Sequence, residues 1–434
     1  MQRHAAPAPN PTRRAFPWLP DAGLDPHPLG SWLLELGFDL WIDAFYRRSV
    51  ILPEAFHTAP GTMIASNHQR DVDGPMLGTV LVRRRGLRFE WPLPFFATRE
   101  DLFRPGILSR LTVHWPKPLP ALLGRISLAW FFPLGRAEPM RRMREFTLGE
   151  ALQALCNAGL GQTDCAELLN ARGLRELAVR HAALADGLAR APPATLDGWW
   201  GLRRLQPGAR RAIATRLRTT VTTQLDHFAQ RLDQGRCVYF APEGTISMDG
   251  HFCRVRAGFF RLVHMAAAPP WIQPMALAYD TLAPGRSRVV IRIGERFRAD
   301  TTLDRRAFDA GLRHAILGLA PVTPSHLLAH WLLHGPTAFT RAELVDWCVH
   351  AHAALHSVHP CLDPLFAHAG VARIVNTRLR WLERRELLIR EGDRFRNACS
   401  RDAPPGWHTP ANVVRYLDNN LEDLVPDVAR VLPC

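Results

Sequence analysis

The sequence predicts an α/β protein whose mixed, mostly parallel sheet is flanked by helices. Short apolar runs alternate with helical stretches between about residues 61 and 297, which is typical of a sheet with helices between its strands. Two of these runs, near residues 65 and 241, lead directly into polar groups. Ligands bind at such places because the carboxyl ends of parallel strands meet at one edge of a sheet. The 434 residues suffice to bury a full core and to carry appended parts.

Changes in composition divide the chain into three predicted parts. Residues 1–30 are rich in proline and arginine, and we expect them to form a flexible leader. Residues 31–300 are expected to form the α/β domain, with an amphipathic helix at its start and a helical insert at about 145–230. Residues 301–434 are expected to form a mainly helical C-terminal region.

The charge of the chain favours anionic partners. The formal net charge is +14, and arginine carries almost all of the positive charge because Lys117 is the single lysine. A basic surface of this kind attracts anionic lipid headgroups, acidic carrier proteins, coenzyme A phosphates or nucleic acid. The eight cysteines include no Cys-x-x-Cys pair, so neither a zinc ribbon nor a disulfide framework is predicted, and a reducing cytoplasm is expected.

Residues 31–46 predict an amphipathic helix. Glu35, Asp39 and Asp43 recur every four residues and therefore share one face, while almost all other positions are large and apolar. Such a helix can lie in a membrane interface, or it can pack on the core of the domain. Because the sequence has neither the apolar core of a signal peptide nor an apolar run of about 18 residues, we expect a protein that is peripheral on the inner face of the membrane, on the cytoplasmic side.

The expected strands are short apolar segments, at residues 61–65, 89–97, 126–134, 237–241, 272–279 and 289–293. Between about 145 and 230 the pattern is strongly helical, with a break at residues 191–193 and an aromatic pair at Trp199 and Trp200. This segment therefore predicts an insert or a lid.

A histidine and a carboxylate follow the first expected strand. His68 lies in a loop, and Asp71 and Asp73 stand where Gly74 and Pro75 indicate the start of a helix. A carboxylate in a first helical turn can bond the ring of a loop histidine, fix its tautomer and stabilise the imidazolium when the other nitrogen takes a proton. With no serine in the motif, the nucleophile would be a hydroxyl of the substrate.

Together with the later run Pro242-Glu243-Gly244-Thr245-Ile246-Ser247, this pattern resembles the glycerolipid acyltransferase superfamily, which includes glycerol-3-phosphate and lysophosphatidic acid acyltransferases. The family's first motif, Asn-His-x-x-x-x-Asp, is matched by Asn67, His68 and Asp73. Its third motif, Phe-Pro-Glu-Gly-Thr-Arg-Ser, is matched from Pro242 onward, with Ile246 where arginine is usual. The resemblance covers about residues 60–297.

Weaker matches lie in the same order along the chain. Residues 99–102 look like the family's Lys-x-Glu-Leu, residues 131–136 are similar to the second motif, an apolar strand that ends in arginine, and residues 273–276 resemble the fourth. A basic residue and a glycine at Arg256 and Gly258 also have counterparts in the family.

The resemblance implies roles for particular residues. His68 would be the general base and Asp73 would orient it, while the acceptor would be held by Arg136, Glu243, Gly244, Thr245, Arg99 and Arg256. Arginine suits this task because its planar fork can grip a phosphate through two bonds. The implied co-substrates are acyl-CoA or acyl-carrier protein as donor, and a lysophospholipid or glycerol phosphate as acceptor. No cofactor and no metal are implied.

Ile246 supports a second hypothesis. Its place in the third motif removes a cation from the acceptor site, so the acceptor headgroup could be neutral, or the protein could be a catalytically inactive lipid- or partner-binding protein on the same scaffold.

The C-terminal region carries weaker signals. His326, His330 and His334 recur every four residues, but no acidic group is interleaved and an amphipathic helix explains them, so we do not predict a metal site. Residues 387–395 predict a hairpin like the wing of a winged helix, but their charges are mixed and nucleic-acid binding is not expected. Residues 414–421 resemble a Tyr-x-x-Asn segment of the larger glycerol-3-phosphate acyltransferases, to which we assign no role.

Overall fold

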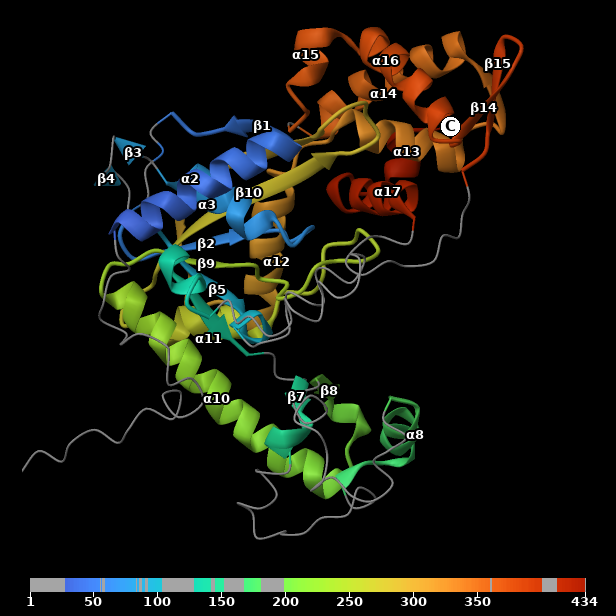
Figure 1. The fold of residues 1–434 in the computed structure, drawn as a ribbon. Helices are drawn as coiled ribbons and strands as arrows, with labels where there is room; N and C mark the ends of the chain where they lie inside the picture. Colours follow the sequence, from blue (N-terminus) through green and yellow to red (C-terminus); the bar gives the residue numbers. More distant parts are fainter. Residues whose placement is uncertain are drawn as a thin grey trace, which may run out of the picture. The chain divides into compact units, whose positions relative to one another are not determined.

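A computed structural model describes the protein at residues 28–54, 56, 59–82, 84–85, 88–89, 93–103, 129–141, 145–151, 168–180, 199–359, 361–399 and 412–433 (Figure 1). Its chain divides into two compact units. The first comprises residues 1–22, 98–133 and 138–228, and the second comprises residues 23–97, 134–137 and 229–434. Most of the predicted leader and the break at residues 191–193 lie outside the described residues.

The predicted α/β class is confirmed. In the described residues the main sheet has eight strands in the order β1-β11-β10-β2-β9-β5-β6, with β12 beside β10. Parallel pairs are β1 with β11, β10 with β2, β2 with β9 and β9 with β5, whereas β10 runs antiparallel to β11 and β12. The strands are β1 (Tyr46–Ile51), β2 (Thr62–Ser66), β5 (Phe95–Arg99), β6 (Ala137–Met140), β9 (Val238–Phe240), β10 (Trp271–Asp280), β11 (Ser287–Ile293) and β12 (Phe297–Arg298).

Most of the expected strands are present. Residues 61–65, 237–241, 272–279 and 289–293 correspond to β2, β9, β10 and β11, and the expected strand at 89–97 is replaced by β4 (Arg88–Phe89) and β5. The expected strand at 126–134 is wrong, since its described part contains turns and the 3₁₀ helix η2 (Phe132–Gly135). The sequence also did not predict β1, which is an edge strand of partly exposed residues and has no buried apolar run.

Helix α2 (Pro28–Phe45) turns its acidic Glu35 toward the domain and an apolar face outward, which is the reverse of what its composition suggests. Ser31, Glu35 and Ile42 are buried, and α2 lies against α3 (Asp73–Leu81). Arg48 neutralises the acids nearer the surface, through contacts of 3.0 Å to Asp39 and 2.7 Å to Asp43.

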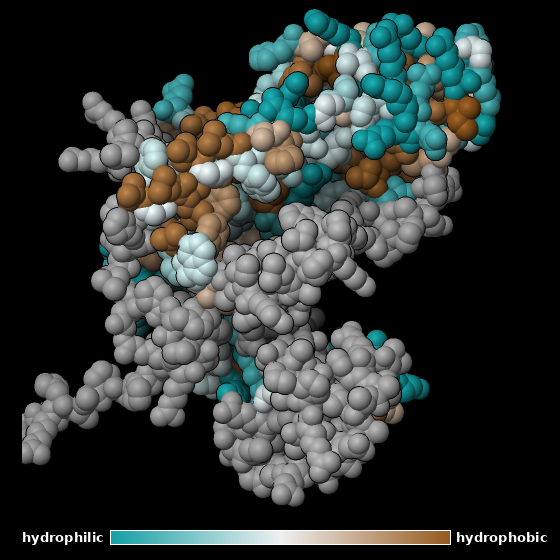
Figure 2. Space-filling view, viewed as in Figure 1, coloured by the Kyte–Doolittle hydropathy of each residue, from teal (hydrophilic) through white to brown (hydrophobic). Residues whose placement is uncertain are grey.

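The outward face of α2 is apolar and is visible as a brown surface in Figure 2. It consists of side chains that are 44 to 66% exposed, at Leu29, Leu33, Leu40, Trp41 and Phe45. The helix therefore does both things that the sequence left open: it packs on the domain, and it presents an apolar face outward. Within the described residues, none of the helices has the length and apolar character needed to cross a membrane.

The predicted insert is helical in part and has its own core. In the described residues it contains α8 (Ala171–Arg180), most of α10 (Pro207–Asp233) and a small antiparallel sheet of β7 (Glu145–Thr147) and β8 (Trp199–Gly201). Phe146, Leu168, Leu205 and Ile213 belong to its hydrophobic cluster. The Trp199–Trp200 pair lies in β8.

The C-terminal region is mainly helical. Its helices are α12 (Arg305–Leu317), α13 (Pro324–His334), α14 (Arg341–Val358), α15 (Leu365–Ala369), α16 (Val371–Arg384), α17 (Val413–Leu424) and α18 (Val428–Val431). A small sheet in the order β13-β15-β14 joins β13 (Ala338–Thr340), β14 (Leu388–Glu391) and β15 (Arg394–Asn397). The predicted hairpin at 387–395 is confirmed, and Gly392 makes its turn with a φ of 67°.

Candidate active site

The loop after β2 is fixed by its own polar side chains. Asn67 donates through Nδ2 to the carbonyl of Leu277 at 2.9 Å and accepts from the backbone nitrogen of Leu277 at 2.8 Å. Its side chain therefore continues the pairing of β2 with β10 beyond the end of the strand. Ser66 bonds the hydroxyl of Tyr239 at 2.9 Å. These buried contacts bring the next residue, His68, to the carboxyl edge of the sheet.

His68 and Asp73 form a hydrogen-bonded pair. Nδ1 of His68 lies 3.0 Å from Oδ2 of Asp73, which is fully buried, whereas the histidine side chain is 21% exposed. Because a carboxylate only accepts, Nδ1 carries the hydrogen of the neutral ring and Nε2 keeps its lone pair. The predicted base and its orienting carboxylate are thus brought together.

Other donors hold the Asp73 carboxylate in place. Oδ2 also accepts from the backbone nitrogens of Gln69 at 2.6 Å and Arg70 at 2.8 Å, and Oδ1 accepts from the hydroxyl of Tyr279 at 2.5 Å. Four donors on one carboxylate leave it little freedom to rotate. Tyr279 is not predicted from the sequence, because a tyrosine within an apolar strand has no signal that separates it from a core residue.

Glu243 joins the second motif to the first. Its Oε1 accepts from the backbone nitrogen of His68 at 2.8 Å, and its Oε2 accepts from the backbone nitrogen of Cys253 at 2.6 Å. The residue is 1% exposed, and burial raises its pKa to about 7, although the two backbone hydrogen bonds act in the opposite direction. Both oxygens are already engaged, so Glu243 positions the two loops, and its predicted contact with the acceptor stays a prediction.

Three further predicted residues lie around Glu243. Gly244 has a φ of 61°, and its backbone nitrogen closes a turn onto Ala241 at 2.9 Å. Arg256, just before α11 (Ala257–Met265), is exposed, and its Nε donates to the carbonyl of Glu243 at 2.8 Å. Thr245 is half-buried. Within the described residues its hydroxyl makes a long contact of 3.5 Å to the carbonyl of Ile246. Arg256 and Thr245 thus keep polar atoms available for a ligand.

Arg136 is not part of this group. The expectation that it ends an apolar strand is wrong, since it follows η2 with a φ of 50° and precedes β6. Its Nη1 donates to the carbonyl of Leu93 at 2.9 Å, and its guanidinium lies over the ring of Phe95. These contacts direct the side chain toward the start of β5, whereas His68 follows the carboxyl end of β2 and Glu243 that of β9. The turn at Arg136 therefore directs its side chain away from the carboxyl edge of the sheet, where the motif predicts it.

Arg99 is the last residue of β5 and is half-buried. It belongs to the first compact unit, whereas His68 and Glu243 belong to the second. Its predicted role as a phosphate ligand stays a prediction.

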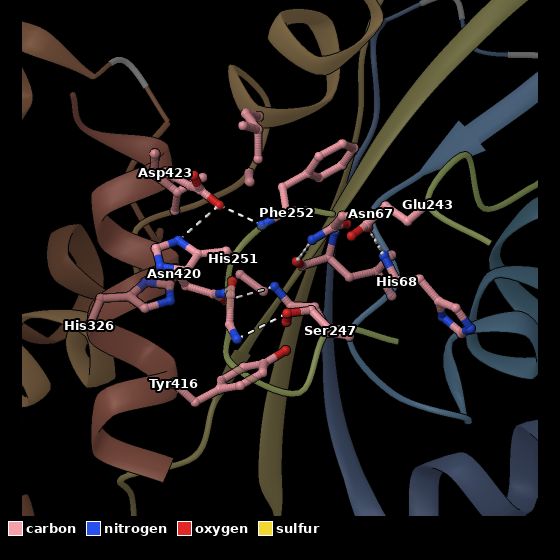
Figure 3. Close-up of a pocket in the computed structure, with 17 residues that line it drawn as sticks. Asn67, His68, Glu243, Ser247, His251, Phe252, His326, Tyr416, Asn420 and Asp423 are labelled. Carbon is pink, nitrogen blue, oxygen red and sulfur yellow. Dashed lines mark hydrogen bonds and ion pairs between the residues drawn. The ribbon is translucent and has the colours of Figure 1, made fainter. Parts of the chain in front are cut away.

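A small pocket lies behind the His68 loop (Figure 3). Asn67, His68, Gln69, Glu243 and Ser247 line one side of it, and the other side includes Tyr416, Asn420, Asp423 and Leu424 from α17. In Figure 3 the imidazole of His68 points away from the residues of α17. The pocket has room for about one or two water molecules and is too small for an acyl chain. The imidazole of His68 is therefore directed away from the residues of α17 that line this pocket.

A candidate metal cluster in the described residues consists of His330, His334 and Asp418. Nδ1 of His330 lies 2.8 Å from the carboxylate of Asp418, and Nε2 of His334 lies 2.7 Å from it. These hydrogen bonds join α13 to α17, so a structural contact between the two helices explains why the three residues lie together.

Comparison with known families finds a similarity in one part of the chain. Residues 204–278 match the model of the acyltransferase family. The matched segment is thus similar to acyltransferases, and it includes β9, the Glu243 turn, α11 and most of β10. The expectation from the motifs is confirmed at this level. The loop with His68 and Asp73 lies outside the matched residues, but the structure joins it to the matched part through Glu243.

Proposed function

We propose that the protein transfers a fatty acyl group from acyl-CoA or acyl-carrier protein to a hydroxyl of a glycerol phosphate or lysophospholipid. The observation that carries the proposal is the hydrogen-bonded pair of His68 and Asp73, tied by 2.8 Å to the Glu243 turn of the acyltransferase domain. A general base near an exposed arginine and a threonine hydroxyl suits acylation of such an acceptor.

The proposed reaction is direct and needs no covalent acyl-enzyme. Nε2 of His68 takes the proton of the acceptor hydroxyl as its oxygen forms a bond to the thioester carbonyl. The carbonyl then re-forms, the carbon–sulfur bond breaks, and the leaving thiolate takes the proton from the imidazolium. Asp73 stabilises the imidazolium while it carries that proton.

Arg256 and Thr245 are the proposed contacts of the acceptor. The guanidinium of Arg256 is exposed and is held beside Glu243 by a single bond through Nε, and its terminal nitrogens suit a phosphate. The Thr245 hydroxyl follows Glu243 by two residues in the same corner. The contact proposed for Gly244 is through its backbone.

The decisive experiment compares purified wild-type protein with His68→Ala. Labelled acyl-CoA and labelled acyl-carrier protein are each incubated with glycerol 3-phosphate and a panel of lysophospholipids. We expect a labelled ester from at least one pair, and its rate should fall by about 10² to 10⁴ in His68→Ala, the usual contribution of a general base. His350→Ala, on an exposed site of α14, is the matched control.

Two results count against the proposal. Near-normal turnover in His68→Ala would refute the role of the imidazole. Retention of lipid without any product, on both donors, would favour the alternative of a catalytically inactive binding protein.

We further propose that the protein acts at the inner face of the membrane, with the outward face of α2 in the interface. The support is the row of exposed apolar side chains on α2, together with the net charge of +14. Such docking would hold the acyltransferase domain next to lipid acceptors.

A further inference from the structure

Helix α17 holds the loop that follows the Glu243 turn. Nδ2 of Asn419 donates to the carbonyl of Asp249 at 2.7 Å, and the carboxylate of Asp423 accepts from the backbone nitrogen of Phe252 at 2.5 Å. Between them, Nδ2 of Asn420 donates to the carbonyl of Gly250. Residues 419, 420 and 423 recur at helical spacing, so one face of α17 binds the backbone of residues 249–252.

Asn420 also bonds the other motif loop. Its Oδ1 accepts from Nε2 of Gln69 at 2.9 Å, and Gln69 directly follows His68. One buried amide, 8% exposed, therefore bridges the His68 loop and the loop after Glu243. Figure 3 shows both bonds of Asn420 as dashed lines. The same residue uses its donor for one loop and its acceptor for the other.

The backbone around Gly250 is shaped to receive α17. Gly250 has a φ of 98°, and a Cβ at this position would lie 2.1 Å from the carbonyl oxygen of Tyr416. Only glycine allows this approach, because any other residue would collide with the backbone of the helix. The close backbone approach at Gly250 brings the loop within reach of the Asn420 side chain, which then fixes its position.

The two loops carry the groups that the proposed reaction needs. The backbone nitrogen of Cys253, just beyond the segment bound by α17, donates to Glu243, and Glu243 accepts from the backbone of His68. Ser247 also donates from its backbone to the carbonyl of His68, at a longer 3.4 Å. Loosening either loop would move the imidazole relative to the acceptor corner.

Helix α17 itself is anchored in the C-terminal region. Asp418 bonds His330 and His334 of α13, and Val414, Leu417 and Leu421 are buried in its hydrophobic clusters. Asn420 therefore projects from a rigid element, which is what precise placement of a reacting group requires.

We propose that Asn420 is a positioning residue of the acyl transfer, which it serves by holding Gln69 and Gly250 and thereby the loops of His68 and Glu243. This inference rests on the proposed function and deepens it: the C-terminal region is a working part of the active site. Asn420 touches no reacting atom and acts through the two loops.

The test is Asn420→Ala in the full chain. We expect kcat to fall on the order of 10²-fold, as displacement of a reacting group by about 1 Å can cause, while KM changes little. Asn397→Ala is the matched control, since Asn397 also donates through Nδ2 to a backbone carbonyl, that of Leu332, and accepts from a backbone nitrogen, that of Cys399 at 3.0 Å. The control should lose similar thermal stability and keep its kcat. Equal effects of the two variants on kcat would overturn the proposal.

A double-mutant cycle with Gln69→Ala separates positioning from general destabilisation. If Asn420 acts partly through Gln69, the double variant should lose less kcat than the product of the two single losses. Independent, multiplying effects would contradict the bridge between these residues.

Hydrogen exchange gives a readout that does not require catalysis. Asn420→Ala should speed exchange of the backbone amides of residues 68–70 and 250–253, and Asn397→Ala should not. If wild-type protein transfers no acyl group but the amides respond as expected, the proposed function fails and the bridge stands. If acyl transfer is found and these amides do not respond, the positioning role fails and the proposed function stands.

Discussion

The backbone nitrogen of His68 donates to the carboxylate of Glu243 at 2.8 Å, across 175 residues of sequence. This bond joins the two motifs at the level of the backbone, so the position of the imidazole depends on the charge state of a buried acid. Since burial raises the pKa of Glu243 to about 7, that charge state changes in the physiological range.

Acid should loosen the link between the two loops. Both oxygens of Glu243 accept backbone hydrogen bonds, which favours the ionised carboxylate, and protonation turns one oxygen into a donor that faces another donor. We expect kcat to decline as the pH falls below about 7, the pKa of Glu243. Glu243→Gln should show a kcat lower by about tenfold or more and without this contribution to the pH profile, since one accepting oxygen is lost.

Stability should respond in the opposite direction to activity. The pKa of Glu243 is raised from its ordinary value of 4.5, so the folded state binds the proton more tightly than the unfolded state. Its contribution to the free energy of unfolding is fully present below pH 4.5 and is lost as the pH rises through about 7. Urea denaturation across this range should show a difference between wild type and Glu243→Gln that shrinks with rising pH. A difference that grows would contradict the raised pKa.

Asp73→Asn should separate orientation from charge. The amide oxygen can still accept from the nitrogens of Gln69 and Arg70, so the loop should keep its shape and the thermal midpoint should change little. The imidazolium loses its counter-charge and the ring its fixed tautomer, and we expect kcat to fall on the order of 10³-fold. Steady-state kinetics and thermal melting on the same sample provide the check. Full activity in this variant would remove Asp73 from the mechanism.

Ile246→Arg should change the choice of acceptor. Ile246 is half-buried and follows Thr245 at the proposed acceptor site, where the motif it resembles has an arginine. A guanidinium there should raise kcat/KM for phosphate-bearing acceptors by about three- to tenfold, relative to neutral acceptors, through charge-assisted hydrogen bonds. Met248→Arg is the control, because it adds the same charge at an exposed position nearby that is not part of the proposed acceptor site. An equal gain in both variants would show that only net charge matters.

Paired substitutions on α2 test membrane docking. Leu33 and Leu40 are 54% and 66% exposed, so Leu33→Glu with Leu40→Glu should leave the fold intact. If these side chains enter a bilayer interface, co-sedimentation with anionic vesicles should weaken by about 10² to 10⁴-fold, because each of the two buried leucines contributes about 1.5–3 kcal/mol. Ile389→Glu, on exposed β14, is the control. Unchanged sedimentation of the α2 variant would show that this face does not bind the membrane.

The sequence predicted the parts of the fold that depend on local pattern. β2, β9, β10 and β11 each contain a run of buried apolar residues, which is the pattern expected of strands that are covered on both faces. The expected strand at 126–134 was equally apolar but contains η2 in its described part, since apolar content alone does not distinguish a strand from a packed turn. For the same reason, the composition of α2 could not show that Glu35 faces inward while Leu40 faces outward.

By itself the sequence predicted the fold class, the similarity to acyltransferases and the pairing of His68 with Asp73, because these depend on short spacings and on residue chemistry. Only the tertiary structure decided that Glu243 grips the backbone of His68, that Arg136 turns toward the start of β5, and that Asn420 bridges two distant loops. Those relationships join residues far apart in the chain, so their geometry depends on how the whole sheet and the C-terminal helices pack, which no local pattern encodes.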